Sequence, residues 1–163
     1  MAFRCATCDD EHDGLPHIGM HAPDPYLDVP EEERAARTTF DVDRCTVRDV
    51  DGHEHYFVRG TILIPVHGEK EMFGFGVWVS QSQANFERYA RNEEMEPTFG
   101  WLVNHIAGYN EPTFLLKVRV HFTVGKQRPT FELEPTDHPL AVEQRTGITL
   151  ARAWEIVHRY MPN

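Results

Sequence analysis

The chain has 163 residues and a mass of 18.9 kDa, and 40% of its residues are hydrophobic. These values suit one folded domain and exclude a disordered chain or a disulfide-held miniprotein. No stretch approaches the ~20 apolar residues that cross a bilayer, and the first residues lack the apolar segment of a secretory signal. We therefore expect a cytoplasmic protein with no membrane partner.

Charge is unevenly distributed along the chain. There are 26 acidic and 16 basic residues, a net charge of −10, and residues 1–54 carry −9 of it. Lys and Arg form no unopposed cluster of the kind that phosphate groups need, so nucleic acid is a poor partner. The acidic end either attracts a basic protein or serves only to keep the protein soluble.

The first 29 residues look irregular because Gly and Pro interrupt them repeatedly. The sequence DVPE at 28–31 predicts a capping box with proline in the first turn. The segment EEERAAR that follows is strongly polar, so we expect a short surface helix there.

The middle of the chain is mostly β-strand by its composition. Residues 39–48 alternate loosely, DG at 51–52 signals a hairpin, and HYFVRGTILIPV and EMFGFGVWVS follow as strands. Gly74 and Gly76 indicate a bulge or a close backbone approach. Ser80 or Ser82 can cap a helix through NFERYAR, whereas FGWLVNHI is ambiguous between strand and helix.

Two later segments have clear periodicity. Alternating apolar residues in TFLLKVRVHFTV predict a half-buried antiparallel strand, and PTFELEP pairs back on it. After Thr149, apolar residues at i, i+3, i+4 and i+7 predict a helix that packs on the core. Together these elements predict one α+β domain over residues 1–163, with an arm at 1–29 and a body at 30–163. Its central, mostly antiparallel sheet lies within 39–134, with helices packed on it.

The segment CATCDDEH at 5–12 has the spacing CxxCxxxH, and Cys45 is the remaining cysteine. A CxxC turn brings two sulfur atoms close enough to share a tetrahedral ion. We predict a structural zinc ion bound by Cys5, Cys8, His12 and Cys45, because three thiolates favour zinc and the set leaves no open position. This ion would fix the arm at 1–29 to the body of the domain. Three unrelated buried thiols are the alternative interpretation.

Other polar residues give weaker signals. His17 or His21 could replace His12 as the ligand, because both lie in the same irregular segment. Asp137 and His138 resemble an acid/base pair, but TDHP at 136–139 also has the composition of a helix start. The histidines of HEH at 53–55 flank a turn, where exposed polar residues explain them equally well. The three tryptophans are expected in the core.

The segments CATCDDEHDGLP, FVRGTILIPV, FGVWVSQSQANFERY and LEPTDHPLAVEQRTGIT resemble a bacterial family known as domain of unknown function 2199 (DUF2199). The resemblance runs from about residue 3 to the final helix. It implies a CxxC, a following histidine and a later cysteine, which Cys5, Cys8, His12 and Cys45 match. One departure is Asp9, at a position where the family commonly has glycine. The family carries no established activity, so the resemblance implies no catalytic residue.

Two functions are compatible with these features. The closed ligand set, the uneven acidity and the lack of a catalytic sequence motif favour a non-enzymatic binding protein. One form of it is an immunity-like protein that neutralises a basic partner, a form suggested by analogy alone. The alternative is a metal-dependent or acid/base hydrolase that uses Asp137 and His138.

Overall fold

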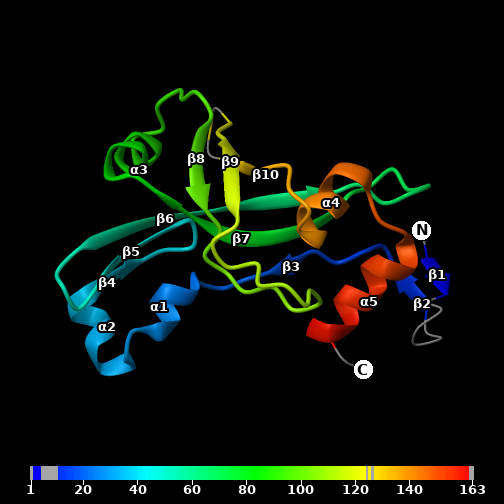
Figure 1. Cartoon of the computed structure of the whole chain (residues 1–163), viewed down its shortest axis with the longest axis horizontal. Helices are drawn as coiled ribbons and strands as arrows, with labels where there is room; N and C mark the ends of the chain where they lie inside the picture. The colour runs from blue at the N-terminus through cyan, green and yellow to red at the C-terminus, as the bar shows by residue number, and fades with distance from the viewer. Residues whose placement is uncertain (1, 5–10, 124, 126, 162–163) are drawn as a thin grey trace.

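The computed structural model describes residues 2–4, 11–123, 125 and 127–161, and side chains from residue 14 onward. Its longest elements are the antiparallel strands β6 (Glu54–Ile64) and β7 (Phe73–Gln81), which cross the centre of the molecule (Figure 1). Both are rich in β-branched and aromatic residues, which favour the pleated conformation. This hairpin is the frame to which the other elements attach.

An eight-stranded sheet forms around the hairpin, with the order β3-β7-β6-β10-β9-β8 along its main path and β4 and β5 attached beside β6. The sheet is mixed, because β3–β7 and β6–β10 are parallel and the other pairings in the described chain are antiparallel. A bridge between Val79 and Leu102 brings the chain after β8 back to β7, so the sheet partly closes on itself. The remaining strands are β3 (Ile18–Gly19), β4 (Thr38–Phe40), β5 (Arg44–Arg48), β8 (Thr98–Trp101), β9 (Lys117–His121) and β10 (Thr130–Leu133).

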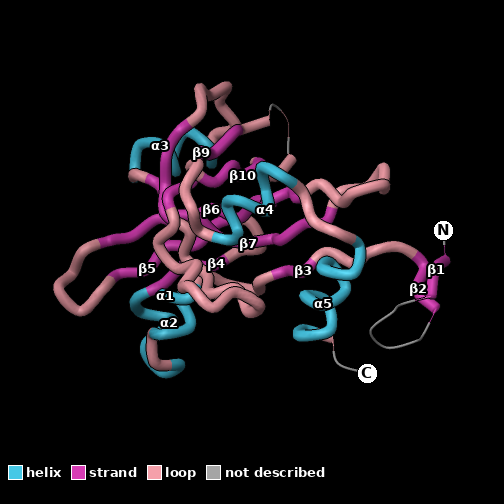
Figure 2. Tube along the Cα trace, turned by 45° about the vertical axis from the view of Figure 1, so that its right-hand side comes forward, coloured by secondary structure: helices cyan, strands magenta, loops and turns pink. Residues whose placement is uncertain are grey.

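Five helices lie around this sheet in the described chain (Figure 2). Near β4 and β5 lie α1 (Asp24–Asp28) and α2 (Glu31–Arg37), and α3 (Gln83–Ala90) follows β7. The opposite end of the molecule carries α4 (Pro139–Thr146) and α5 (Leu150–Tyr160). A pair of short strands, β1 (Ala2–Arg4) and β2 (Glu11–Asp13), forms a separate antiparallel sheet beyond α5.

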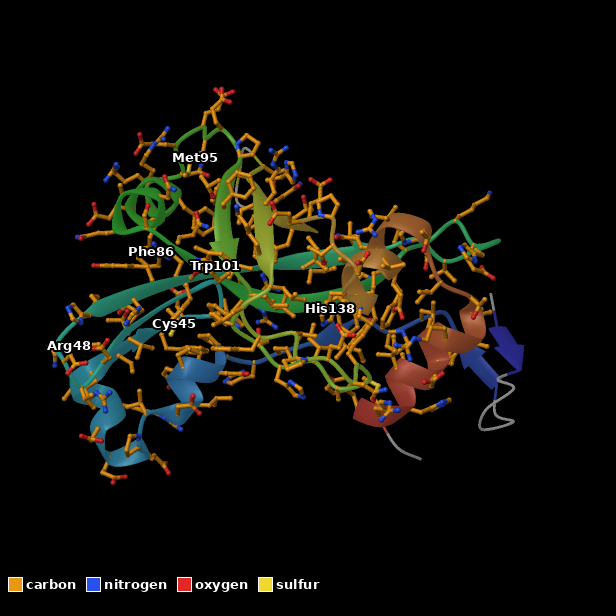
Figure 3. All side chains as sticks on the ribbon, in the orientation of Figure 1. Cys45, Arg48, Phe86, Met95, Trp101 and His138 are labelled. Atoms are coloured by element: carbon orange, nitrogen blue, oxygen red, sulfur yellow. The ribbon has the colours of Figure 1, made fainter. Side chains whose placement is uncertain are left out.

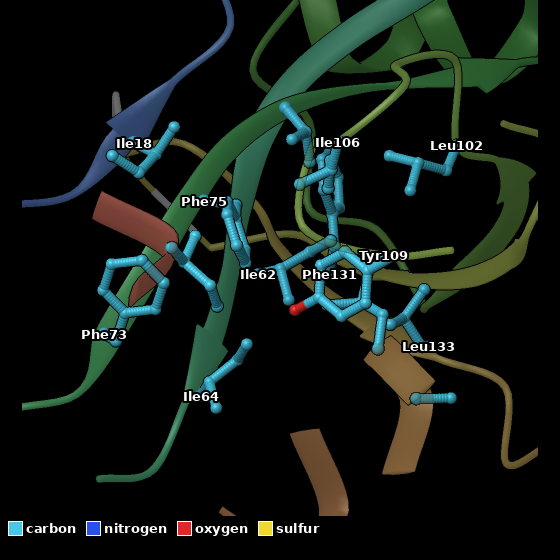
Figure 4. Close-up of a cluster of buried hydrophobic side chains, with 14 of the residues drawn as sticks. Ile18, Ile62, Ile64, Phe73, Phe75, Leu102, Ile106, Tyr109, Phe131 and Leu133 are labelled. Atoms are coloured by element: carbon cyan, nitrogen blue, oxygen red, sulfur yellow. The ribbon is translucent and has the colours of Figure 1, made fainter. Parts of the chain in front are cut away.

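Alternation along β6 and β7 separates the buried side chains onto two faces. One face carries Ile62 and Phe75, which pack with Phe131 of β10 in the main core (Figure 4). The other face carries Phe57 and Trp78. A second cluster forms there, and its other members are Val29, Cys45, Val47 and Val103. Each fully buried aliphatic or aromatic side chain contributes about 1.5–3 kcal/mol to stability.

Most of the predicted architecture is confirmed. The chain is α+β with a mostly antiparallel sheet, and the C-terminal helix buries its apolar stripe in the main core. Ser82 and Thr149 cap α3 and α5 through their side chains, as predicted. Gly74 is confirmed as a close approach, because a Cβ there would lie 2.8 Å from the ring of His17 in the segment that leads into β3.

The prediction that residues 1–29 are irregular is wrong. This segment contains β1, β2, β3 and α1. Its three strands have only two or three residues each, so their stability comes from the partner strand, which no local pattern reveals. The predicted capping box is also wrong, because α1 runs through Asp28 and α2 begins after Pro30 without a side-chain cap.

Candidate functional site

One face of three neighbouring strands forms the floor of a cavity of about 410 Å³, open to solvent, which we call the Trp101 groove. Strand pairing sets Val47 of β5 opposite His55 of β6, and Phe57 of β6 opposite Ser80 of β7. Paired residues in antiparallel strands share a face. The pairing therefore brings these four side chains to one surface, above the second hydrophobic cluster.

The lining of the Trp101 groove is mainly apolar. Its apolar members come from α1, the floor strands, β8 and the chain after it: Pro25, Val29, Val47, Phe57, Trp101, Val103, Phe114 and Leu115. Two of them remain largely exposed, with Trp101 at 49% and Leu115 at 56%. Large side chains exposed together at a concave surface are typical of a binding site.

The expectation that all three tryptophans are core residues is wrong for Trp101. It lies on β8, above Cys45 in Figure 3, and it belongs to neither hydrophobic cluster. The reason is its neighbour Gly100, which faces β7 so closely that a Cβ would collide with the backbone oxygen of Ser80. Alternation then turns Trp101 outward. An indole flanked by a glycine on an edge strand is a signal that sequence reasoning could have used.

Leu115 adopts an unusual backbone conformation at the edge of the groove. Its φ angle is +70°, in the left-handed region, where a leucine costs about 1–3 kcal/mol. The amide N–H of Leu115 donates to the carbonyl oxygen of Leu102 at 2.6 Å, and this bond holds the turn. Strain of this kind persists where the surroundings impose it, and it is concentrated at functional sites.

Two buried polar residues hold in place the chain segments that lead to Leu115. Asn104 is 1% exposed, accepts from the Trp78 amide at 2.8 Å and donates to the Ala22 carbonyl at 2.9 Å. Thr113 donates to the Asn104 carbonyl at 2.9 Å. Buried polar groups with satisfied hydrogen bonds fix a single arrangement of the chain. Sequence reasoning missed both residues, because nothing in a loop sequence indicates which amide or hydroxyl becomes buried.

The rim of the groove is polar and carries carboxylates. Its polar members are Asp28, Arg37, Asp49, His55 and Ser80. Asp49 accepts two backbone N–H bonds and lies 2.9 Å from the ring of His55. These hydrogen bonds lower the pKa of Asp49 from 3.8 to about 2, and the bond with His55 has the largest effect. Arg37 pairs with Glu33 at 3.4 Å, so its charge is matched within α2.

Asp49 also belongs to a group that could hold a metal ion. One ligand atom from each of Asp49, Asp51 and His53 lies within 4.8 Å of the others. All three residues are at or next to the β5–β6 turn, where exposed acidic groups are common without any ion. The turn confirms the predicted DG hairpin, with Gly52 at a φ of +87°.

The residues of the predicted zinc site are not brought together among the described residues. Cys5 and Cys8 lie outside the described part of the chain, and His12 is placed only as a backbone position in β2. Cys45 is fully buried in β5, where its thiol lies 3.8 Å from the Thr46 carbonyl oxygen. Burial raises the pKa of this thiol to about 12.

Cys45 packs in the second apolar cluster, away from the described strands of the arm. Figure 3 shows it at the opposite end of the molecule from the place of β1 and β2 in Figure 1. Of the alternative ligands, His17 is exposed, with a ring nitrogen 3.2 Å from the Met72 carbonyl oxygen, and His21 makes a tilted ring contact with Phe40.

The Asp137–His138 pair takes the form of a helix start. His138 is the N-cap of α4, and its Nδ1 accepts from the Leu140 amide at 3.1 Å. Its Nε2 lies 3.1 Å from the carbonyl oxygen of Pro112, to which it donates. Both ring nitrogens are therefore engaged, which leaves neither for acid/base chemistry with a substrate. This geometry favours the capping interpretation over the catalytic one.

The comparisons with known proteins identify a family and no individual relative. A family model described as "Uncharacterized protein conserved in bacteria (DUF2199)" matches residues 4–148. No match emerged among curated proteins or among solved structures. None of the helices in the described part of the chain has the length and apolarity that a membrane span requires.

Proposed function

The chain belongs to the DUF2199 family of bacterial proteins, and from its own geometry we propose that it is a non-enzymatic binding protein that receives a basic protein at the Trp101 groove. The observation that carries this proposal is the groove itself. It combines exposed apolar side chains with a carboxylate rim, whereas His138, the histidine of the suggested acid/base pair, is occupied in capping a helix. An immunity-like protein, which neutralises a basic toxin, is one form of this function.

The charge around the groove supports a basic partner. Residues 24–54 supply α1, α2, β4, β5 and the following turn, and they contain ten acidic and four basic residues, a net charge of −6. Opposite charge speeds encounter and suppresses the wrong partners. A second copy of this chain is disfavoured as the occupant, because each copy carries a net charge of −10.

The proposal also includes a metal site, for which the structure supports the ligands that lie in the arm. Pairing of Arg4 with Glu11 brings together the two ends of the six-residue connection that contains Cys5 and Cys8, and His12 follows within β2. This supports a structural zinc ion with Cys5, Cys8 and His12 among its four ligands. A cytoplasmic location is also proposed, because a free buried thiol such as Cys45 suits a reducing compartment.

The experiment uses a panel of immobilised peptides that differ in charge and in apolar content. We expect the protein to be retained by peptides that combine Lys or Arg with large apolar residues, with an association rate that falls as salt rises. Glu31→Lys with Glu32→Lys, on the exposed surface of α2, should abolish retention.

The matched control is Glu69→Lys with Glu71→Lys. These exposed glutamates lie in the turn between β6 and β7, and the change in net charge is the same. The control should retain the peptides as the wild type does. Equal losses in both double variants, or no retention of basic apolar peptides by the wild type, would overturn the proposed function.

A further inference from the structure

We propose that the Trp101 groove binds one large apolar side chain from a basic segment of the partner protein. We propose also that Leu115 is held in its strained conformation to form the apolar wall of the groove. This inference rests on the proposed function and specifies what the partner must present. The ligand is a peptide segment in which a Leu or Phe stands beside Lys or Arg.

The Trp101 groove combines an apolar wall with carboxylates. One wall is apolar, formed by Trp101, Phe114 and Leu115, which are 49%, 39% and 56% exposed. The polar part of the lining includes the carboxylates of Asp28 and Asp49. A ligand that matches both parts has an apolar group to bury against the wall and a cation to place beside the carboxylates.

The rim of the groove keeps negative charge after the charged side chains have paired within the protein. Arg37 is matched by Glu33 at 3.4 Å. The carboxylate of Asp49 lies on the rim, 2.9 Å from the ring of His55. The carboxylate of Asp28 makes no hydrogen bond or ion pair with any described residue. The rim therefore offers negative charge to a ligand, and an anionic or neutral polar ligand would leave it uncompensated.

Leu115 has a left-handed backbone conformation. A φ of +70° suits glycine, and a leucine there is disfavoured both by its backbone and by the exposure of its side chain. Folding alone therefore gives no reason for leucine at this position. The geometry instead presents the side chain at the mouth of the groove, where a bound apolar group would cover it.

The structure supplies a reporter for this contact. Trp78 and Trp154 are 0% and 3% exposed, so acrylamide in solution reaches mainly Trp101 among the three indoles. The probe is the acetylated, amidated peptide Lys-Lys-Leu-Phe-Lys-Lys, which contains no tryptophan. Its binding to the full chain should reduce the quenchable fluorescence. Lys-Lys-Ser-Ser-Lys-Lys and Glu-Glu-Leu-Phe-Glu-Glu should give no protection at the same concentration.

The decisive variant is Leu115→Gly. It should weaken binding of the probe by about tenfold or more, the expected result of losing the burial of a leucine side chain. Its Tm should equal or exceed that of the wild type, since glycine relieves the strain. The matched control is Asn92→Gly, at the other non-glycine residue with positive φ among those described, beyond α3 and outside the groove lining. It should leave binding unchanged.

The outcomes separate this inference from the proposed function. If Leu115→Gly binds the probe as tightly as the wild type does, the inference is overturned and the proposed function stands. Equal protection by the serine peptide shows recognition of charge alone and also overturns it. Protection of Trp101 that depends on protein concentration without peptide identifies a second copy as the occupant, against the inference. Failure of every basic peptide to bind overturns both.

Discussion

The carboxylate of Asp49 lies 2.9 Å from Nε2 of His55, across the turn that joins β5 to β6. The same carboxylate accepts the backbone N–H groups of Asp51 and His53. One side chain therefore orders the turn and also supplies charge to the rim of the Trp101 groove.

Asp49→Asn should make the stability of the turn independent of acid. The folded pKa of Asp49 is about 2, below its ordinary value of 3.8. Its ionised form therefore contributes stability above about pH 3.8, and this contribution is lost as the pH falls through 2. The difference in Tm between wild type and Asp49→Asn should narrow from pH 5 to pH 2. Asp51→Asn, the same charge change in the same turn, is the control and should show a smaller difference at pH 5.

Cys45 should be inert in the folded protein. It is fully buried, and burial raises the pKa of its thiol to about 12, so almost no thiolate exists at pH 8. In a Cys5→Ser, Cys8→Ser background, a thiol-reactive dye should label less than one group per chain in hours under native conditions. It should label one group at once in denaturant. Rapid native labelling would contradict the packing of the second cluster.

Zinc should depend on the arm and not on Cys45. Elemental analysis of the purified protein should find one zinc ion per chain, lost in Cys5→Ser and in Cys8→Ser. Cys45→Ala should keep the metal, because Cys45 lies in β5 at the other end of the molecule. Loss of zinc from Cys45→Ala, with the fold intact by circular dichroism, would instead support the four-ligand set predicted from the sequence.

Gly60→Ala should destabilise the protein by about 1–3 kcal/mol, the usual cost of overpacking. A Cβ at this position would lie 2.5 Å from the ring of Phe131 and from the carbonyl oxygen of Pro129, where β10 meets β6. Gly76→Ala in the paired strand β7 is the matched control. The atom nearest to its Cβ would be the Cα of Gly19 at 3.6 Å, an ordinary contact, so the urea midpoint of this variant should stay close to that of the wild type.

The sequence predicted the periodic parts of the fold and missed those that depend on contacts between distant segments. The alternation of Val118 and Val120 identified β9, and both residues are buried. The extent of that strand was overestimated, because residues 113–116 form the turn that sets Leu115 at positive φ. No local pattern encodes a strained leucine.

The candidate site was predictable only in its charge. The acidity of the first third of the chain is evident in the composition, and two of its carboxylates, Asp28 and Asp49, line the Trp101 groove. The groove itself requires Phe57, Trp101 and Leu115 to meet, and these residues come from three separate segments. Their meeting depends on the buried amide of Asn104 and hydroxyl of Thr113.

The length of β6 has a consequence for how the molecule melts. Residue 57 of this strand belongs to the cluster under the groove, and Ile62 belongs to the main core. A single strand thus contributes to both hydrophobic clusters, and we expect the two to lose their packing together. We expect one cooperative transition, with calorimetric and van't Hoff enthalpies that agree. A substitution in either cluster would then lower the melting temperature of the whole sheet, including the binding surface.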